Sequence, residues 1–131
     1  MLDSSQGGSL TAASLLDPQV ITTTTLSPSG YWRDVSQDEG YILVVVSYGT
    51  ITATSAQVQL ESSASSTGSS PASGGTAAQL PAVLAAGSPT QQTLLLPASF
   101  FANRYVGASC AVTGTGNVPV SIVLLGSGDK L

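Results

Sequence analysis

The chain of 131 residues contains no histidine and a single cysteine. Histidine is the commonest general base and zinc ligand near neutral pH, so its absence removes most catalytic triads and zinc sites. The one cysteine, Cys110, excludes a disulfide within the chain, and no histidine is present to activate its thiol. We therefore expect a protein that is not an enzyme, that carries no cofactor or metal, and that folds without an oxidising compartment.

Charged and aromatic side chains are scarce, at 8% and 5% of the residues. About a quarter of the residues in a typical soluble domain are charged. Here 21 serines and 14 threonines supply most of the polar surface instead. A surface of this kind repels its own copies weakly and is often covered by neighbours. The composition therefore favours a protein that works within an assembly.

The balance of charge argues against several classes of partner. The net charge is −4, and the basic residues Arg33, Arg104 and Lys130 are scattered. No basic patch exists to neutralise phosphates, so we expect no direct binding of nucleic acid. No apolar run approaches the roughly 20 residues of a membrane span, and residues 1–8 lack the basic and apolar regions of a secretion signal. We therefore expect neither a membrane protein nor export by the Sec route.

The seven acidic residues form no catalytic or metal-binding pattern. Glycoside hydrolysis needs two carboxylates that face a cleft, and only Glu61 lies within a clear strand, on the side expected to face water. Asp34, Asp38 and Glu39 are close in sequence, but their spacing is not that of an EF-hand. We interpret them as solvated carboxylates in a turn.

The segment Gly40–Ser62 contains two β-rich runs that organise the sequence. The runs Tyr41–Tyr48 and Ile51–Glu61 are separated only by Gly49 and Thr50, a spacing that favours a β-hairpin with a tight II′ turn. The second run alternates between apolar and polar residues, which predicts one face in the core and one in water. The first run is apolar on both faces. It is therefore either a central strand covered on both sides or a strand that contacts another protein.

Other apolar and β-branched runs predict the remaining strands. They are Val20–Leu26, Gln79–Ala85, Gln92–Leu96, Arg104–Thr113 and Val118–Leu125. The last two are joined by a Gly-rich turn and predict a second hairpin, in which Cys110 faces the core. Seven or eight short strands without a long helix indicate an all-β fold, namely an antiparallel β-sandwich similar to a jelly roll.

The sequence predicts one domain with an N-terminal extension. Residues 1–19 contain a Gly-Gly pair and scattered leucines, which favour a flexible tail or an extended arm that becomes ordered on a neighbouring subunit. Residues 20–131 are expected to form the sandwich. Within it, residues 62–78 are rich in serine and glycine and bury too little apolar surface to offset their ordering entropy, which predicts a long mobile loop.

Short motifs between residues 20 and 126 point to a known family. They are Gly40-Tyr41 before a valine-rich strand, Gly49-Thr50-Ile51-Thr52, Val58-Gln59-Leu60-Glu61-Ser62, Asn103-Arg104-Tyr105-Val106 and the last strand, Val120–Gly126. With these motifs the chain resembles small all-β structural proteins of tailed bacteriophages, the head decoration (cement) proteins. It departs from that pattern in two places. The Ser-rich loop replaces an Asp-Gly turn and a tryptophan, and Gly107 stands where a second arginine is common.

The resemblance implies a structural virion protein that binds the outer surface of a phage capsid and stabilises it. It implies the major capsid protein as a partner, self-association as a homotrimer, and a location on the capsid exterior after synthesis in the host cytoplasm. The alternative is a phage tail, fibre or host-surface recognition module in which the Ser-rich loop or Trp32 contacts a glycan. A secreted adhesin or carbohydrate-binding module is a third reading, and the single tryptophan argues against it, since sugar platforms usually need aromatic rings.

The residues expected to contact a partner lie in the arm, in Tyr31–Val35, which is expected to be a short strand or an aromatic bend, and on the doubly apolar strand. They are Leu10, Leu15 and Leu16; Tyr31, Trp32 and Arg33; and Tyr41, Leu43 and Val45. If the rest of the sandwich leaves the last three uncovered, another subunit is expected to cover them.

Overall fold

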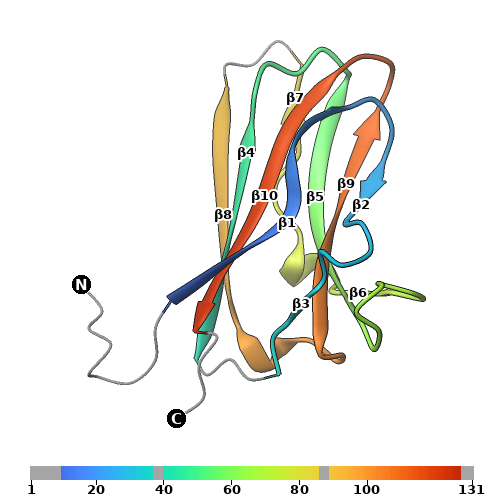
Figure 1. The fold of residues 1–131 in the computed structure, drawn as a ribbon. Helices are drawn as coiled ribbons and strands as arrows, with labels where there is room; N and C mark the ends of the chain where they lie inside the picture. The colour runs from blue at the N-terminus through green and yellow to red at the C-terminus, as the bar shows by residue number, and fades with distance from the viewer. Residues whose placement is uncertain (1–9, 37–39, 86–88, 128–131) are drawn as a thin grey trace.

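The computed structural model describes residues 10–36, 40–85 and 89–127. Its strands form two antiparallel sheets that pack face to face (Figure 1), which confirms the expected all-β sandwich. The described residues contain ten strands. That number exceeds the seven or eight expected because four of the strands are two-residue pairings. None of the helices in this part of the chain has the length and apolar character needed to cross a membrane.

The first sheet has four strands. Their order is β1 (Leu10–Ile21), β10 (Val118–Ser127), β4 (Tyr41–Tyr48) and β8 (Thr90–Pro97). All three pairings are antiparallel. Strands β4 and β10 are therefore central, whereas β1 and β8 form the two edges of the sheet.

The second sheet is built on β5 (Ser55–Ser63) and β9 (Tyr105–Thr113), which pair along their whole length. Four short strands flank them. They are β2 (Thr25–Leu26) and β3 (Arg33–Asp34) beside β9, and β6 (Ala72–Ser73) and β7 (Val83–Leu84) beside β5. Two 3-10 turns, Thr76–Ala78 and Ala98–Phe100, complete the described elements.

Both expected hairpins are wrong, because β4 and β5 lie in different sheets, as do β9 and β10. Residues 49–54 and 114–117 instead cross between the sheets at the same end of the sandwich. The two crossings bind each other: the Thr52 amide donates to the Asn117 carbonyl, and the Asn117 amide donates to the Thr52 hydroxyl. Ile51 is 2% exposed. A crossing that passes over the end of the core buries this side chain, whereas a tight turn within one sheet would leave it in water.

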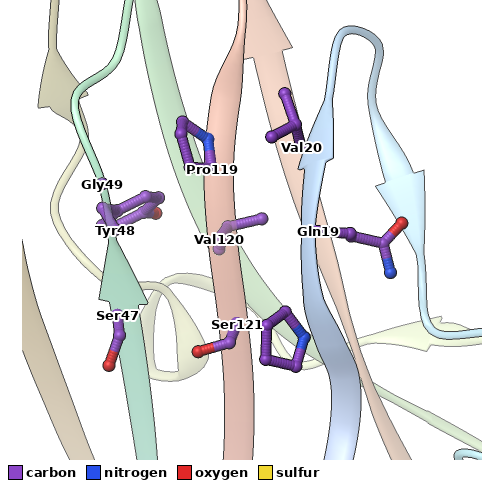
Figure 2. A pocket seen from close by; sticks show the side chains of 9 residues that line it. Gln19, Val20, Ser47, Tyr48, Gly49, Pro119, Val120 and Ser121 are labelled. Carbon is purple, nitrogen blue, oxygen red and sulfur yellow. The ribbon is translucent and has the colours of Figure 1, made fainter.

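Residues 10–19, expected to belong to an N-terminal arm, lie in strand β1 of the sandwich. Strand β1 pairs with β10, and Figure 2 shows Gln19 and Val20, near the end of β1, beside β10. Leu15 and Leu16 are buried in the core. The expected boundary after residue 19 therefore falls inside a strand, and residues 1–9 of the expected arm lie outside the described residues.

The strand expected at Val20–Leu26 is also divided between the sheets. Strand β1 ends at Ile21 in the first sheet, and β2 begins at Thr25 in the second. The threonines between them turn the corner. Thr24 helps to attach this corner, since its hydroxyl accepts a hydrogen bond from the Val112 amide of β9.

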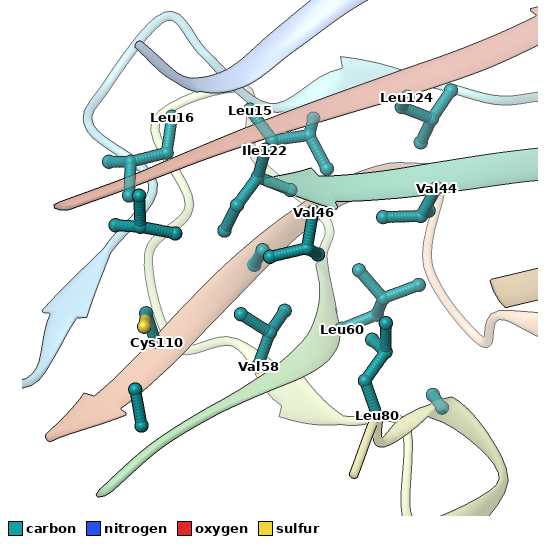
Figure 3. Close-up of a cluster of buried hydrophobic side chains, with 14 of the residues drawn as sticks. Leu15, Leu16, Val44, Val46, Val58, Leu60, Leu80, Cys110, Ile122 and Leu124 are labelled. Atoms are coloured by element: carbon teal, nitrogen blue, oxygen red, sulfur yellow. The ribbon is translucent and has the colours of Figure 1, made fainter. Parts of the chain in front are cut away.

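The core lies between the sheets and consists mainly of alternate residues of the long strands, joined by residues of the connections such as Ile51 and Leu80 (Figure 3). All the residues expected to point inward from β5 and β10 are buried. They are Ala56, Val58, Leu60, Val118, Val120, Ile122 and Leu124. Cys110 of β9 is also fully buried, as its alternation with apolar residues predicts. Fully burying one aliphatic side chain stabilises a fold by about 1.5–3 kcal/mol, so these strands carry most of the stabilising burial.

Residues of the Ser-rich segment 62–78, expected to form a long mobile loop, make hydrogen bonds with each other and with the second sheet. The Gln59 side-chain amide of β5 donates to the Ser73 hydroxyl of β6 at 2.7 Å. The Ser63 hydroxyl donates to the Ser69 carbonyl, also at 2.7 Å. The serines therefore place this segment by hydrogen bonding, a contribution that an argument from apolar burial alone does not count.

Candidate interaction surface

The outer face of the first sheet points away from the core and carries apolar residues of β4. Tyr41 is 61% exposed, and Leu43 and Val45 are half-buried. The residues that alternate with them, Ile42, Val44, Val46 and Tyr48, are buried between the sheets. The doubly apolar strand is therefore covered on its inner face by this chain, whereas its outer face is covered by no other layer of the described residues.

Strand register places further apolar residues beside these three. Leu43 pairs with Leu125 of β10 on one side and with Leu95 of β8 on the other, and Leu125 pairs with Ala12 of β1. One row of apolar residues therefore crosses all four strands. The next row pairs Val45 with Val123. We define the apolar face as these residues with Tyr41 and its partner Pro97: Ala12, Tyr41, Leu43, Val45, Leu95, Pro97, Val123 and Leu125.

Toward the crossings the outer face becomes more polar. The Gln91 side chain donates to the Ser47 hydroxyl there. An open hollow of about 370 Å³ is lined by residues of β1, β10 and β4 beside this region, among them Val20 and Pro119 (Figure 2). No charged side chain lines the hollow. The outer face thus offers apolar and hydroxyl contacts rather than ionic ones.

The outer face of the second sheet is partly covered by the chain's own loops. Trp32 is 5% exposed, and its ring lies over Gly107 of β9, where an added Cβ would be 2.6 Å from the ring. The indole N–H donates to the Ser27 carbonyl at 2.9 Å. Gln57 of β5 donates to the Leu80 carbonyl. The chain's own loops therefore lie over this face at Gly107 and Gln57, whereas Ala111 of β9 is exposed.

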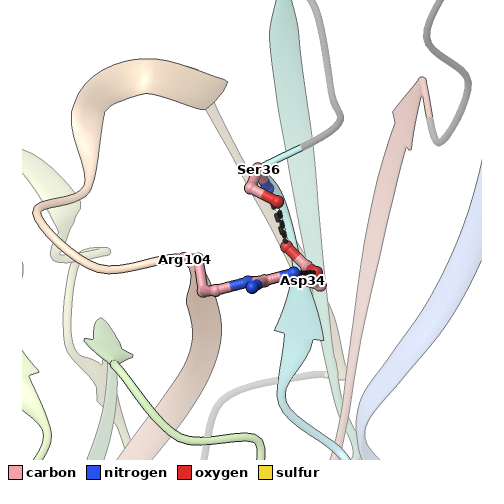
Figure 4. Close-up of polar contacts among 3 residues, drawn as sticks. All are labelled: Asp34, Ser36 and Arg104. Atoms are coloured by element: carbon pink, nitrogen blue, oxygen red, sulfur yellow. Dashed lines mark hydrogen bonds and ion pairs between the residues drawn. The ribbon is translucent and has the colours of Figure 1, made fainter.

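A surface ion pair fixes the start of β9. The Arg104 guanidinium donates to the Asp34 carboxylate, which also accepts hydrogen bonds from the amide and hydroxyl of Ser36 (Figure 4). The hydrogen bond from Arg104 lowers the pKa of Asp34 to about 2. Asp38 and Glu39, the neighbours of Asp34 in sequence, lie outside the described residues. No group of three His, Cys, Asp or Glu side chains that could share a metal occurs in the described part.

Several residues expected to contact a partner lie inside the fold instead. Leu15 and Leu16 are in the core, and Trp32 is covered by the chain's own loop, so these side chains do not reach a partner from their positions. Leu10 begins β1, opposite Ser127 of β10.

The other residues of the expected aromatic bend are half-buried. The Tyr31 hydroxyl donates to the Asp17 carboxylate at 2.6 Å, which ties the bend to β1 and lowers the pKa of Asp17. Arg33 lies in β3, paired with Val106. Of the eight expected residues whose side chains the structure describes, only Tyr41, Leu43 and Val45 lie together on one open face.

The members of the apolar face that sequence reasoning missed are Ala12, Leu95, Pro97, Val123 and Leu125. A usable signal was present in β10, because Ile122–Leu125 is apolar on both faces, the same pattern that singled out Tyr41–Val46. Leu94, Leu95 and Leu96 are likewise apolar on both faces of β8. Because Leu96 is buried, Leu95 faces the opposite side of the sheet.

Cys110 has the properties of a structural core residue. Burial raises the pKa of its thiol to about 11, which disfavours the nucleophilic thiolate. Burial also raises the pKa of Tyr48, whose hydroxyl lies in the same part of the core. Neither group is poised to react near neutral pH.

Comparison with known proteins gives a likeness of fold. No family model and no curated protein matches the chain. Among solved structures, a chain in the structure of infectious bursal disease virus, Gx strain, is similar over 95% of this chain, with a TM-score of 0.54 and 8% sequence identity. This chain spans 33% of that viral chain. A chain of Bacillus endospore appendages, which form disulfide-linked pili, matches over 95% of this chain and 93% of its own length, with a TM-score of 0.42 and 13% identity. The viral similarity shows that the two proteins share a β-sandwich fold.

Proposed function

We propose that this protein is a structural virion protein that binds the major capsid protein on the outer surface of a phage head and stabilises the shell. The observation that carries the proposal is the apolar face. Antiparallel sheets that face water usually carry polar residues on that side, and here apolar residues of four adjacent strands lie there together. Contact with a shell would remove this surface from water. Burial of apolar surface contributes a favourable free energy of about 25 cal/mol per Å².

Three further features support this role. The motifs resemble those of head decoration proteins, the fold is shared with a chain of a virus, and charged residues make up only 8% of the chain. A protein on the capsid exterior stabilises the shell through the sum of many copies, because each copy contributes only a modest net binding free energy after the cost of association. Repeated across many capsomer junctions, these contacts would oppose the pressure of packaged DNA.

The proposal predicts that purified particles contain many copies per head, as counted by quantitative mass spectrometry. Heads that lack the protein should rupture at lower temperature. A few copies per particle, or recovery only with isolated tails, would contradict the proposal and favour the tail or host-recognition alternative.

Substitutions on the apolar face test the surface itself. Leu43→Asp and Leu125→Asp should each weaken shell binding by about tenfold or more, because a buried carboxylate without a partner costs at least 1–3 kcal/mol. The matched control is Ala111→Asp, an exposed position on β9 in the second sheet, which should bind normally. Occupancy is measured on heads that lack the protein, after circular dichroism has established that each variant folds. Equal occupancy for all three variants would exclude the apolar face as the contact.

A further inference from the structure

The two edges of the first sheet differ in how they are protected against pairing with another strand. Strand β1 carries Asp17 and Pro18, and its register with β10 shifts twice around them. Charge, proline and irregular register are the devices that block edge pairing. Strand β8 pairs regularly with β4 over its full length and has no charge and no proline before Pro97. Its outer edge pairs with no strand of the described residues.

Strands β8 and β7 each carry one exposed leucine. Leu95 of β8 is 57% exposed, and Leu84 of β7 is 67% exposed. These two strands lie close together, since the Gln92 side chain of β8 donates to the Pro81 carbonyl just before β7. The edge thus has an open strand in the first sheet and an exposed leucine in the second.

The charge pattern indicates which partner fits this edge. No charged residue occurs between Glu61 and Arg104, a stretch that includes β7 and β8. A second copy of the chain carries the same net charge of −4, so it approaches with least repulsion through an uncharged surface. A basic or acidic partner would find no opposite charge here to bind. The edge therefore fits another copy better than a charged macromolecule.

We propose that two copies pair through their β8 strands, antiparallel and related by a two-fold axis, so that the two four-stranded sheets become one sheet of eight strands. A register centred on Leu95 places Leu95 opposite its own copy and Leu94 opposite Leu96 of the second copy. The apolar row from Ala12 to Leu95 then continues into the second copy across all eight strands. The remaining edges are both β1, which are protected, so the assembly closes at two copies.

This inference concerns the protein alone and does not depend on binding to a capsid. It gives a dimer where the resemblance to decoration proteins implies a trimer. Sedimentation velocity of the purified protein should give the mass of two 13.0 kDa chains. A trimer, or a monomer at about 100 µM, where any contact tighter than roughly −5.5 kcal/mol would be seen, would overturn it.

Substitutions at the two edges locate the contact. Leu95→Lys and Thr93→Lys, both at exposed positions of β8, should convert the dimer to a monomer with an unchanged circular dichroism spectrum. The control is Val20→Lys, at a position of β1 that is 59% exposed, and it should remain dimeric. Loss of the dimer in the control as well, or in none of the three, would contradict pairing through β8.

A cross-link tests the register without destabilising the edge. Leu95→Cys should form a disulfide with its own copy under mild oxidation, because the two side chains meet at the two-fold axis. The product is a covalent dimer on a non-reducing gel, and the native Cys110 does not compete because it is buried. Val20→Cys should stay monomeric on the same gel. Absence of the cross-link in Leu95→Cys, or equal cross-linking in both variants, would overturn the proposed register.

Discussion

The contact between Trp32 and Gly107 shows how one residue accounts for a departure from the resembled family. The indole ring lies where any side chain at position 107 would project. An arginine there, as is common among decoration proteins, would require the ring to leave its site. Trp32 is therefore part of this chain's own packing, which removes the main residue-level support for a glycan-binding role.

We predict that Gly107→Ala destabilises the fold by about 1–3 kcal/mol, because overpacking of a tight contact costs that much. Urea denaturation followed by far-ultraviolet circular dichroism measures the change, because this signal is also available in proteins that lack Trp32, the single tryptophan of the chain. In a Trp32→Ala background the same substitution should cost much less, since the obstructing ring is gone and the two residues are coupled. Equal costs in both backgrounds would show that the ring is not the obstacle.

The ion pair of Asp34 and Arg104 predicts a pH dependence at the acid end. The folded pKa of Asp34, about 2, lies below the ordinary value of 3.8, so the contribution of this carboxylate to stability is present above pH 4 and disappears as the pH falls toward 2. The free energy of unfolding should therefore be greater for the wild type than for Asp34→Asn at pH 6, and the difference should close between pH 4 and 2. Denaturant titrations at several pH values measure it.

Glu61 provides a control of opposite sign. Burial raises the pKa of this carboxyl above its ordinary value, so its ionised form costs stability, and that cost is relieved as the pH falls through the raised pKa. Glu61→Gln should therefore be the more stable protein at pH 6, with the advantage lost in acid. If the free energy of unfolding of the wild type instead rose relative to that of Asp34→Asn as the pH fell, the prediction for Asp34 would be contradicted.

At the scale of the element, β1 is an integral strand rather than an arm. Leu15 is fully buried, and truncating a buried leucine typically costs about 2–5 kcal/mol. Leu15→Ala should therefore lower the free energy of unfolding by that amount, whereas Val20→Ala, at an exposed position of the same strand, should change it by less than about 0.5 kcal/mol. Thermal or urea unfolding of the two variants gives the comparison. If Leu15→Ala had the same free energy of unfolding as the wild type, the interpretation of these residues as a flexible arm would be supported instead.

Strands could be predicted from the sequence where a residue pattern is local. The alternation of Val58 and Leu60 with polar residues, and of Ile122 and Leu124 in the last strand, identified which side chains face the core. The partners of these strands could not be predicted in the same way, because a short Gly-containing connection suits both a hairpin and a crossing between sheets. Ile51 distinguishes the two connections in the structure, because its side chain is buried where residues 49–54 cross over the end of the core.

At the scale of the whole molecule, the candidate surface was predictable in part. The doubly apolar pattern of β4 identified Tyr41, Leu43 and Val45, because it depends only on the sequence of one strand. The extension of the surface to Leu95 and Leu125 depends on register between strands far apart in the chain. Burial of Trp32 likewise depends on a loop that folds back over the second sheet. These features arise from tertiary packing, which composition and local alternation do not encode.

The pairing of Leu10 with Ser127 has a consequence for display. The described chain enters the fold and leaves it at neighbouring positions of two adjacent strands, at the end of the sandwich away from the crossings (Figure 1). In a variant without residues 1–9 and 128–131, peptides attached to Leu10 and to Ser127 would therefore start side by side at one end of the sandwich. In the same shortened variant, a short linker from Ser127 to Leu10 would give a circular backbone. A circular permutant could then begin within residues 114–117, at the opposite end of the sandwich.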